Sequence, residues 1–114
     1  MITTAELWNK DQALRRMMGK ESLLQRVVAL FLEQYPTQWQ TLRSNLETGD
    51  LAGVQAQAHT LKGSAGELAL PALTDCFANI EQAAKMRDLP ATTSACEQTQ
   101  PVADRTLEAL QQDC

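Results

Sequence analysis

Apolar residues recur along most of the chain at intervals of three and four, which is the period of an amphipathic α-helix. The clearest example lies between Asp50 and Pro71, where six apolar positions alternate these steps without a slip: Leu51, Val54, Ala58, Leu61, Ala65 and Leu68. Asp50 is a suitable N-cap for such a segment. The pattern therefore predicts a helix of a bundle with one buried seam.

The N-terminal part of the chain, up to residue 49, predicts three helices. Residues 3–6, Thr-Thr-Ala-Glu, fit a capping box and start a short helix that breaks before Gly19. A helix over residues 20–35 follows from the apolar positions Leu24, Val27, Val28, Phe31 and Tyr35. Pro36 is expected to interrupt this helix, because proline removes a backbone donor. A separate helix then ends at residues 48–49 and carries Trp39, Leu42 and Leu46.

The C-terminal part predicts two more helices. Pro71 suits the first turn of one, which is expected to end near residues 88–90. Its inward positions are predicted to be Leu73, either Cys76 or Phe77, Ile80 and Ala84. The last helix is predicted over residues 91–112, with Pro101 either kinking it or starting its longer half. Its buried positions are predicted to be Cys96, Ala103, Leu107 and Leu110.

No segment shows a convincing strand pattern. Amphipathic helices joined by short loops predict an all-α fold, an antiparallel four-helix bundle with an additional short N-terminal helix. A chain of 114 residues is large enough for one core but not for two. We therefore expect residues 1–114 to form a single helical bundle domain.

Charge and hydropathy favour protein partners over nucleic acid or membranes. The formal net charge is −4, whereas nucleic acid and anionic lipid surfaces attract clustered cations. The longest strongly apolar run, residues 27–32, is far shorter than the roughly 20 residues that span a bilayer. The first residues also lack the pattern of a secretory signal. We expect a cytoplasmic domain that contacts neither nucleic acid nor membrane.

The three cysteines indicate neither a disulfide framework nor a zinc site. They are odd in number, widely spaced and without a C-x-x-C pair. We expect three reduced thiols, with Cys76 and Cys96 packed in helices and Cys114 at the frayed end of the chain.

The only histidine of the chain, His59, lies on the predicted helix that follows Asp50. An α-helix turns by about 100° per residue, so the side chain of His59 points well over 90° away from the centre of the apolar seam. Lys62, Gly63 and Gly66 fall on the same side, at the offsets that make neighbours on a helix. Each interior glycine lowers the stability of a helix by up to about 1 kcal/mol relative to alanine. We therefore expect these two glycines to have a structural or functional reason. Bare backbone beside the ring would let a large partner approach.

The residues of this face can also be explained without any chemical function. A lone surface histidine is usually inert, Lys62 can be a solvated charge, and Gly63 and Gly66 can be positions of close packing. A neutral imidazole is nevertheless a good nucleophile near pH 7. There is no second histidine, no phosphate-binding loop and no paired metal-ligand spacing, so we do not expect the domain to bind ATP or to hydrolyse a substrate. Glu67 and Glu81 are taken as isolated surface carboxylates without a catalytic role.

The stretch AHTLKGSAGEL (58–68) closely resembles the signature of histidine-containing phosphotransfer (HPt) domains, modules of bacterial multistep phosphorelays. The resemblance extends through LTDCFANIEQAAK (73–85). It implies a phosphoryl carrier without an ATP site or kinase activity of its own, and without a bound cofactor. The magnesium ion would come from the partner receiver domain. Ala69 stands where family members often have glycine, and Glu67 stands where asparagine is common.

The resemblance also implies a role for each site residue. His59 would accept a phosphoryl group on its outer ring nitrogen from a receiver aspartate and pass it to the aspartate of another receiver. Lys62 would offset the charge of the phosphate, and Gly63 would leave room for the receiver to dock. The partners would be receiver domains of a hybrid sensor kinase and of a response regulator, which this chain would meet as a monomer. As the C-terminal domain of such a kinase, it would be tethered to the inner membrane through the parent protein.

Three other interpretations stay open at this point. One is a helical interaction module in which His59 is inert, and another is a phosphotransfer domain of the chemotaxis-kinase type. A third is a dimerising kinase domain. In such domains an acidic residue usually follows the histidine, whereas Thr60 follows His59, so this interpretation is disfavoured. A docking patch around His59 is expected to include residues of the first helix such as Leu14, Met17 and Met18, with at least one of the two methionines in the core.

Overall fold

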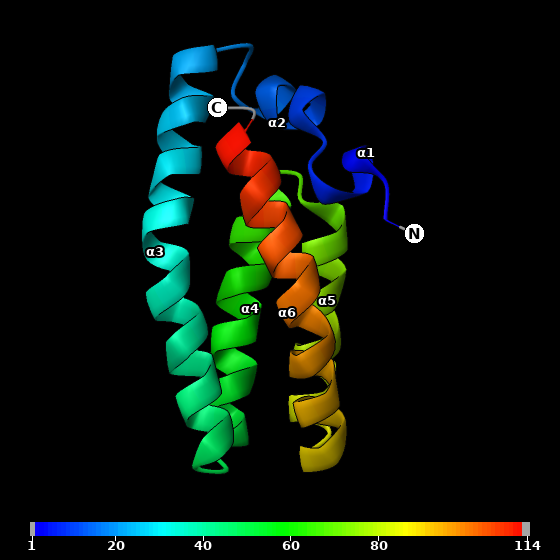
Figure 1. Cartoon of the computed structure of the whole chain (residues 1–114). Helices are drawn as coiled ribbons and strands as arrows, with labels where there is room; N and C mark the ends of the chain where they lie inside the picture. Colours follow the sequence, from blue (N-terminus) through cyan, green and yellow to red (C-terminus); the bar gives the residue numbers. More distant parts are fainter. Residues whose placement is uncertain (1, 113–114) are drawn as a thin grey trace.

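The computed structural model describes residues 2–112, which form six helices (Figure 1). Their bounds are α1 (Thr4–Leu7), α2 (Lys10–Arg16), α3 (Glu21–Glu47), α4 (Leu51–Glu67), α5 (Pro71–Lys85) and α6 (Leu89–Gln112). The four long helices α3 to α6 run alternately in opposite directions, and the described residues contain no strand. The predicted all-α four-helix bundle is confirmed, and its N-terminal addition consists of two short helices.

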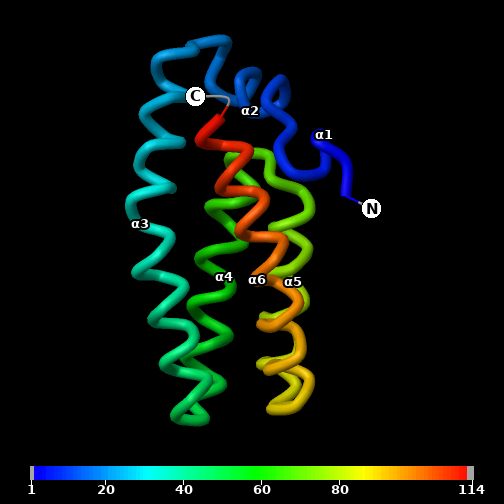
Figure 2. Tube along the Cα trace, viewed as in Figure 1, coloured from blue at the N-terminus to red at the C-terminus, as the bar shows by residue number. Residues whose placement is uncertain are grey.

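These two short helices lie across one end of the bundle, beside the turn that joins α4 to α5 (Figure 2). The predicted capping box starts α1: the Glu6 backbone N–H donates to Thr3 Oγ1 at 3.2 Å, and the Thr3 backbone N–H donates to the Glu6 carboxylate at 3.4 Å. The Asn9 side chain caps α2 by accepting from the Gln12 backbone N–H. Both ends thus satisfy backbone donors that short helices would otherwise leave to water.

Helix α3 is continuous through Pro36, so the predicted break at this residue is wrong. A proline inside a helix costs about 3 kcal/mol. The aromatic residues Phe31, Tyr35 and Trp39 stack on both sides of it, with ring centroids 5.6 Å and 6.2 Å apart. All three are buried, and burial of three large aromatic side chains on one face offsets the loss of one backbone hydrogen bond. The apolar seam runs in phase across the proline.

The two C-terminal helices follow the prediction, except that α5 ends at Lys85 rather than near residues 88–90, since Arg87 adopts a left-handed conformation and the Asp88 side chain accepts from the first turn of α6. Pro71 occupies the first turn of α5, and of the two alternatives Phe77 is the buried residue whereas Cys76 is only partly buried. Helix α6 begins two residues earlier than predicted and continues through Pro101. Leu107, predicted to be buried, packs against the core while remaining partly exposed. Cys76 and Cys96 are free thiols, as expected, and Cys114 lies outside the described residues.

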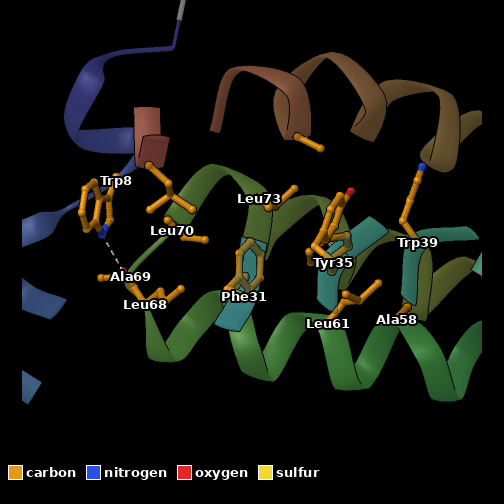
Figure 3. Close-up of a cluster of buried hydrophobic side chains, with 14 of the residues drawn as sticks. Trp8, Phe31, Tyr35, Trp39, Ala58, Leu61, Leu68, Ala69, Leu70 and Leu73 are labelled. Carbon is orange, nitrogen blue, oxygen red and sulfur yellow. Dashed lines mark hydrogen bonds between the residues drawn. The ribbon is translucent and has the colours of Figure 1, made fainter. Parts of the chain in front are cut away.

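The core lies between the long helices and extends to the N-terminal cap (Figure 3). Five of the six predicted seam positions of α4 are at most 1% exposed: Val54, Ala58, Leu61, Ala65 and Leu68. Leu51, in the first turn, is partly buried. Among residues 2–112, no helix is both long enough and apolar enough to cross a membrane. The seam fixes which side of α4 faces solvent, and the histidine lies on that side.

Candidate functional site

The ring of His59 projects from the middle of α4, with 69% of its side chain exposed to solvent. The preceding residue Ala58 and the residue two further on, Leu61, are completely buried. Because neighbouring positions on a helix are about 100° apart, burying one side of α4 directs His59 outward. The predicted outward orientation is confirmed.

A carboxylate from the next helix contacts both candidate functional side chains of α4. Glu81 of α5 has one oxygen, Oε2, 2.8 Å from His59 Nδ1. Its other oxygen, Oε1, accepts a hydrogen bond from Lys62 Nζ at 2.5 Å. The expectation that Glu81 is an isolated surface carboxylate is therefore wrong, and Lys62 is paired and partly buried rather than a free solvated charge.

The electrostatics of this cluster assign the proton on the imidazole. The hydrogen bond from Lys62 is the largest cause that holds the pKa of Glu81 below its ordinary value; burial opposes this shift, and the bond with His59 supports it. Glu81 is consequently ionised near pH 7, and an ionised carboxylate only accepts hydrogen bonds. Nδ1 of His59 must then be the donor. In the neutral form of the imidazole, Nε2 then carries the lone pair, and within residues 2–112 no side chain or backbone group is hydrogen-bonded to it.

The two glycines near the ring are not positions of close packing. A Cβ atom added at Gly63 or at Gly66 would meet nothing within 4 Å. On the N-terminal side of the ring, an open recess of about 520 Å³ is lined mainly by small or short side chains: Ala52, Gln55, Ala56 and Thr60 with His59 and Glu81. The surface on both sides of His59 along α4 is thus low, and a large partner could reach the ring.

Three donors from the N-terminal segment hold the last backbone carbonyls of α4 and the turn after it. Trp8 Nε1 donates to Leu68 O at 3.0 Å, the contact drawn as a dashed line in Figure 3. The Asn9 backbone N–H donates to Ala69 O at 2.9 Å, and the Arg16 guanidinium donates to Gly66 O. Carbonyls at a helix C-terminus have no partner inside the helix, so these donors fix the end of the helix that carries His59.

Ala69 adopts a left-handed conformation, with φ of 57°. This conformation costs a residue other than glycine roughly 1–2 kcal/mol. The turn that follows α4 therefore keeps the backbone shape that glycine favours, although a side chain is present. The carbonyl of Ala69 is one of those bound by the N-terminal segment, and this contact helps to hold the strained turn.

The residues expected to surround the docking face divide between core and surface. Met17 is buried, Leu14 is partly buried, and Met18 is 83% exposed next to the end of α2. The expectation that at least one methionine belongs to the core is confirmed. Within residues 2–112, no group of three or more histidine, cysteine, aspartate or glutamate residues is arranged to hold a metal ion.

One family model matches the sequence over most of its length. The family model described as "Hpt domain" matches residues 26–113, which is most of the chain. The chain belongs to the Hpt domain family. Hpt domains carry phosphoryl groups on histidine in phosphorelays, exchange them with receiver domains and have no kinase activity of their own. The match begins within α3, so α1 and α2 lie outside the part that this Hpt domain shares with the family model.

Neither a curated protein nor a solved structure matches the sequence significantly.

Proposed function

We propose that His59 is the phosphorylated residue of this Hpt domain. It accepts a phosphoryl group from the aspartyl phosphate of one receiver domain and transfers it to the aspartate of a second. One observation carries the proposal: the only histidine of the chain is exposed on an open helix face, with Nδ1 bound to Glu81 and Nε2 left free as a nucleophile. An inert histidine of an interaction module needs no such arrangement.

The transfer follows from the geometry of the cluster. Nε2 of His59 attacks the phosphorus atom, the N–P bond forms, and the P–O bond to the receiver aspartate breaks and leaves a carboxylate. Onward transfer reverses these steps on another receiver. Phosphoryl transfer depends mainly on positioning and on neutralising charge. Lys62, already beside the ring through Glu81, supplies one cation, and Gly63 leaves space for the loops of the receiver.

The rest of the chemistry belongs to the partner. The receiver supplies the magnesium ion and the acidic residues that bind it. The two receivers are those of a hybrid sensor kinase and of a response regulator, and the domain works as a monomer. The docking surface is centred on His59 and Gly63, and the exposed side chain of Met18 at the end of α2 adds an apolar contact at its edge.

The test is transfer from a labelled receiver. A receiver domain phosphorylated with labelled acetyl phosphate is incubated with Mg²⁺ and the protein. We expect acid-labile, base-stable label on the protein, and none on the His59→Gln variant, because an amide cannot act as the nucleophile. His59 is exposed, so the variant should unfold at the same temperature as the wild type. Equal labelling of the two proteins would overturn the proposal.

A further inference from the structure

We infer that the side-chain amide of Gln55 binds the phosphoryl group on His59, as a hydrogen-bond donor on the N-terminal side of the ring. The inference rests on the proposed function and deepens it, because it assigns a further contact to the group that His59 is proposed to carry. Gln55 lies one helical turn before His59, whereas Lys62 lies one turn after it. The two side chains thus flank the ring along α4.

The recess beside His59 provides the space for this contact. Side chains of an α-helix lean toward its N-terminus, so the ring of His59 leans over the turn that carries Gln55 and Ala56. Both residues line the open recess of about 520 Å³ together with the ring itself. A phosphoryl group on Nε2 therefore has room on this side of the ring, next to the amide of Gln55.

Among the side chains that line the recess, that of Gln55 has donors to offer. Its amide carries two N–H donors, and within residues 2–112 it forms no hydrogen bond. The Thr60 hydroxyl already donates to Ala56 O at 3.2 Å, and Ala52 has no polar group in its side chain. The carboxylate of Glu81 only accepts hydrogen bonds. A phosphoryl oxygen that enters the recess thus meets one unoccupied donor group.

Gln55 differs in this respect from Gln57, the other glutamine of α4. The Gln57 amide donates to Gln38 O of α3 at 3.3 Å, so it is held between two helices. Gln55 is also partly buried, but its amide has no such partner. A partly buried amide without a partner loses hydration and gains no bond in return. The phosphoryl group supplies the acceptor that the free protein lacks.

The chemistry of a phosphoryl group suits this donor. It brings up to about two negative charges and three acceptor oxygens. Hydrogen bonds to an ionised acceptor are about twice as strong as those between neutral groups. Lys62 supplies a point charge on a flexible stem, whereas the amide of Gln55 adds a directed donor on the other side of the ring. Gln55 makes and breaks no covalent bond; it holds the phosphoryl group in position for transfer.

The first measurement follows the side-chain amides by ¹H–¹⁵N NMR, with phosphoramidate as a small-molecule phosphodonor. Phosphorylation of His59 should shift one amide proton of Gln55 downfield and slow its exchange with water, because this proton becomes hydrogen-bonded. The amides of Gln57 and of the exposed Gln98 on α6 are internal controls and should not respond in this way. Unchanged Gln55 signals in the phosphorylated protein would overturn the inference.

The second measurement is the ratio of phosphorylated domain to phosphorylated receiver at equilibrium. Gln55→Ala should lower this ratio about fivefold, because a hydrogen bond to a charged group is lost. Gln55→Glu should lower it further, since a carboxylate has no donor and repels the phosphoryl group. Gln98→Ala is the matched control and should leave the ratio unchanged. Equal ratios in wild type and Gln55→Ala would contradict the inference.

The outcomes distinguish three kinds of failure. If Gln55→Ala slows transfer but changes neither the ratio nor the stability, Gln55 contacts the receiver and the inference is wrong. If Gln55→Ala lowers the melting temperature while the ratio stays the same, its role is structural and the inference is again wrong. If phosphoramidate labels His59 but no receiver does, the proposed function fails, and the NMR signals of Gln55 still decide whether its amide binds the phosphoryl group.

Discussion

The two faces of helix α4 differ in the kinds of residue that they carry. On the buried face every position from Val54 to Leu68 in the seam is apolar and excluded from solvent. On the exposed face stand a titratable ring, a cation and two glycines, residues that add little to helix stability. The first face holds the domain together, and the second face presents a nucleophile.

This division explains how a helix tolerates Gly63 and Gly66 in its interior. Helices in proteins are stabilised mainly by packing of one face rather than by intrinsic propensity. The seam residues of α4 lie against α3 and α5, and donors from the N-terminal segment hold its far end. The residues of the exposed face are therefore not needed to stabilise the helix and can instead serve the approach of a partner and the chemistry of His59. Substitutions on the two faces should affect different measurements.

The largest effect is expected on the buried face. Leu61→Ala should lower the free energy of unfolding by about 2–5 kcal/mol, because it removes a completely buried side chain and leaves a cavity. Urea unfolding monitored by circular dichroism gives this value. The folded fraction should still accept phosphate on His59. A loss of transfer in protein shown to be folded would mean that the two faces are coupled.

A substitution at Gly63 should change the transfer rate and the stability in opposite directions. Gly63→Gln should slow transfer from a receiver at least tenfold, about 1.4 kcal/mol, because the new side chain fills the space where the receiver docks. The same change should raise the free energy of unfolding by up to about 1 kcal/mol, since glycine is a poor helix former. Single-turnover transfer and urea unfolding measure the two effects. Gly63→Ala, the smaller control, should stabilise the protein at least as much and impede transfer less.

Lys62→Ala is expected to act mainly on transfer. We expect about a fivefold slower reaction and a stability loss below about 1 kcal/mol, because Lys62 forms a partly exposed ion pair. Lys85→Ala on the surface of α5 is the charge-matched control.

The stability difference caused by Lys62→Ala should depend on pH. Glu81 has a pKa held below its ordinary value of 4.5, so its ion pair stabilises the fold above that pH and is lost as the pH falls further. Urea unfolding of both proteins at pH 7 and pH 3 measures this change. A difference that grows in acid would contradict the assigned pair.

The smallest effect is expected at the end of α4. Ala69→Gly should change the free energy of unfolding by less than about 0.5 kcal/mol. Glycine relieves the cost of the left-handed conformation but loses a buried methyl group and gains freedom in the unfolded chain. Thermal and urea unfolding would reveal a larger change. A stabilisation above about 1 kcal/mol would show that the strain is greater than the contacts around Ala69 suggest.

The periodic pattern of the sequence was sufficient to predict the bundle and the direction of His59. The prediction is wrong at Pro36, because the apolar seam continues in phase from Phe31 to Trp39 and the helix does not break at the proline. The spacing of three and four residues between apolar positions is the same on both sides of Pro36, which indicates one continuous helix. The aromatic face of α3 also packs across the bundle, with the rings of Tyr35 and Trp39 each 6.3 Å from the ring of Phe77 in α5. A rule for proline in an isolated helix does not take such packing into account.

The site was predicted in part. His59, Lys62 and Gly63 share a face of one helix, which spacing along the chain can predict. Glu81 lies on another helix, and its position beside the ring depends on how α4 and α5 pack and rotate against one another. Sequence spacing within a single helix contains no such information. The only available signal was that Glu81 follows the buried Ile80, which places it near the edge of the interface.

The donors that hold the end of α4 mark a difference between the shared family segment and the unit that folds. Trp8, Asn9 and Arg16 all precede residue 26, where the family match begins. A protein trimmed to the matched segment would retain His59, Lys62 and Glu81, but Leu68 O and Ala69 O would lose the donors Trp8 and Asn9, and Gly66 O would keep only backbone partners such as Ala69 N. The N-terminal segment thus supplies, from outside the family match, the side-chain and backbone donors that hold the C-terminal end of the helix that carries His59.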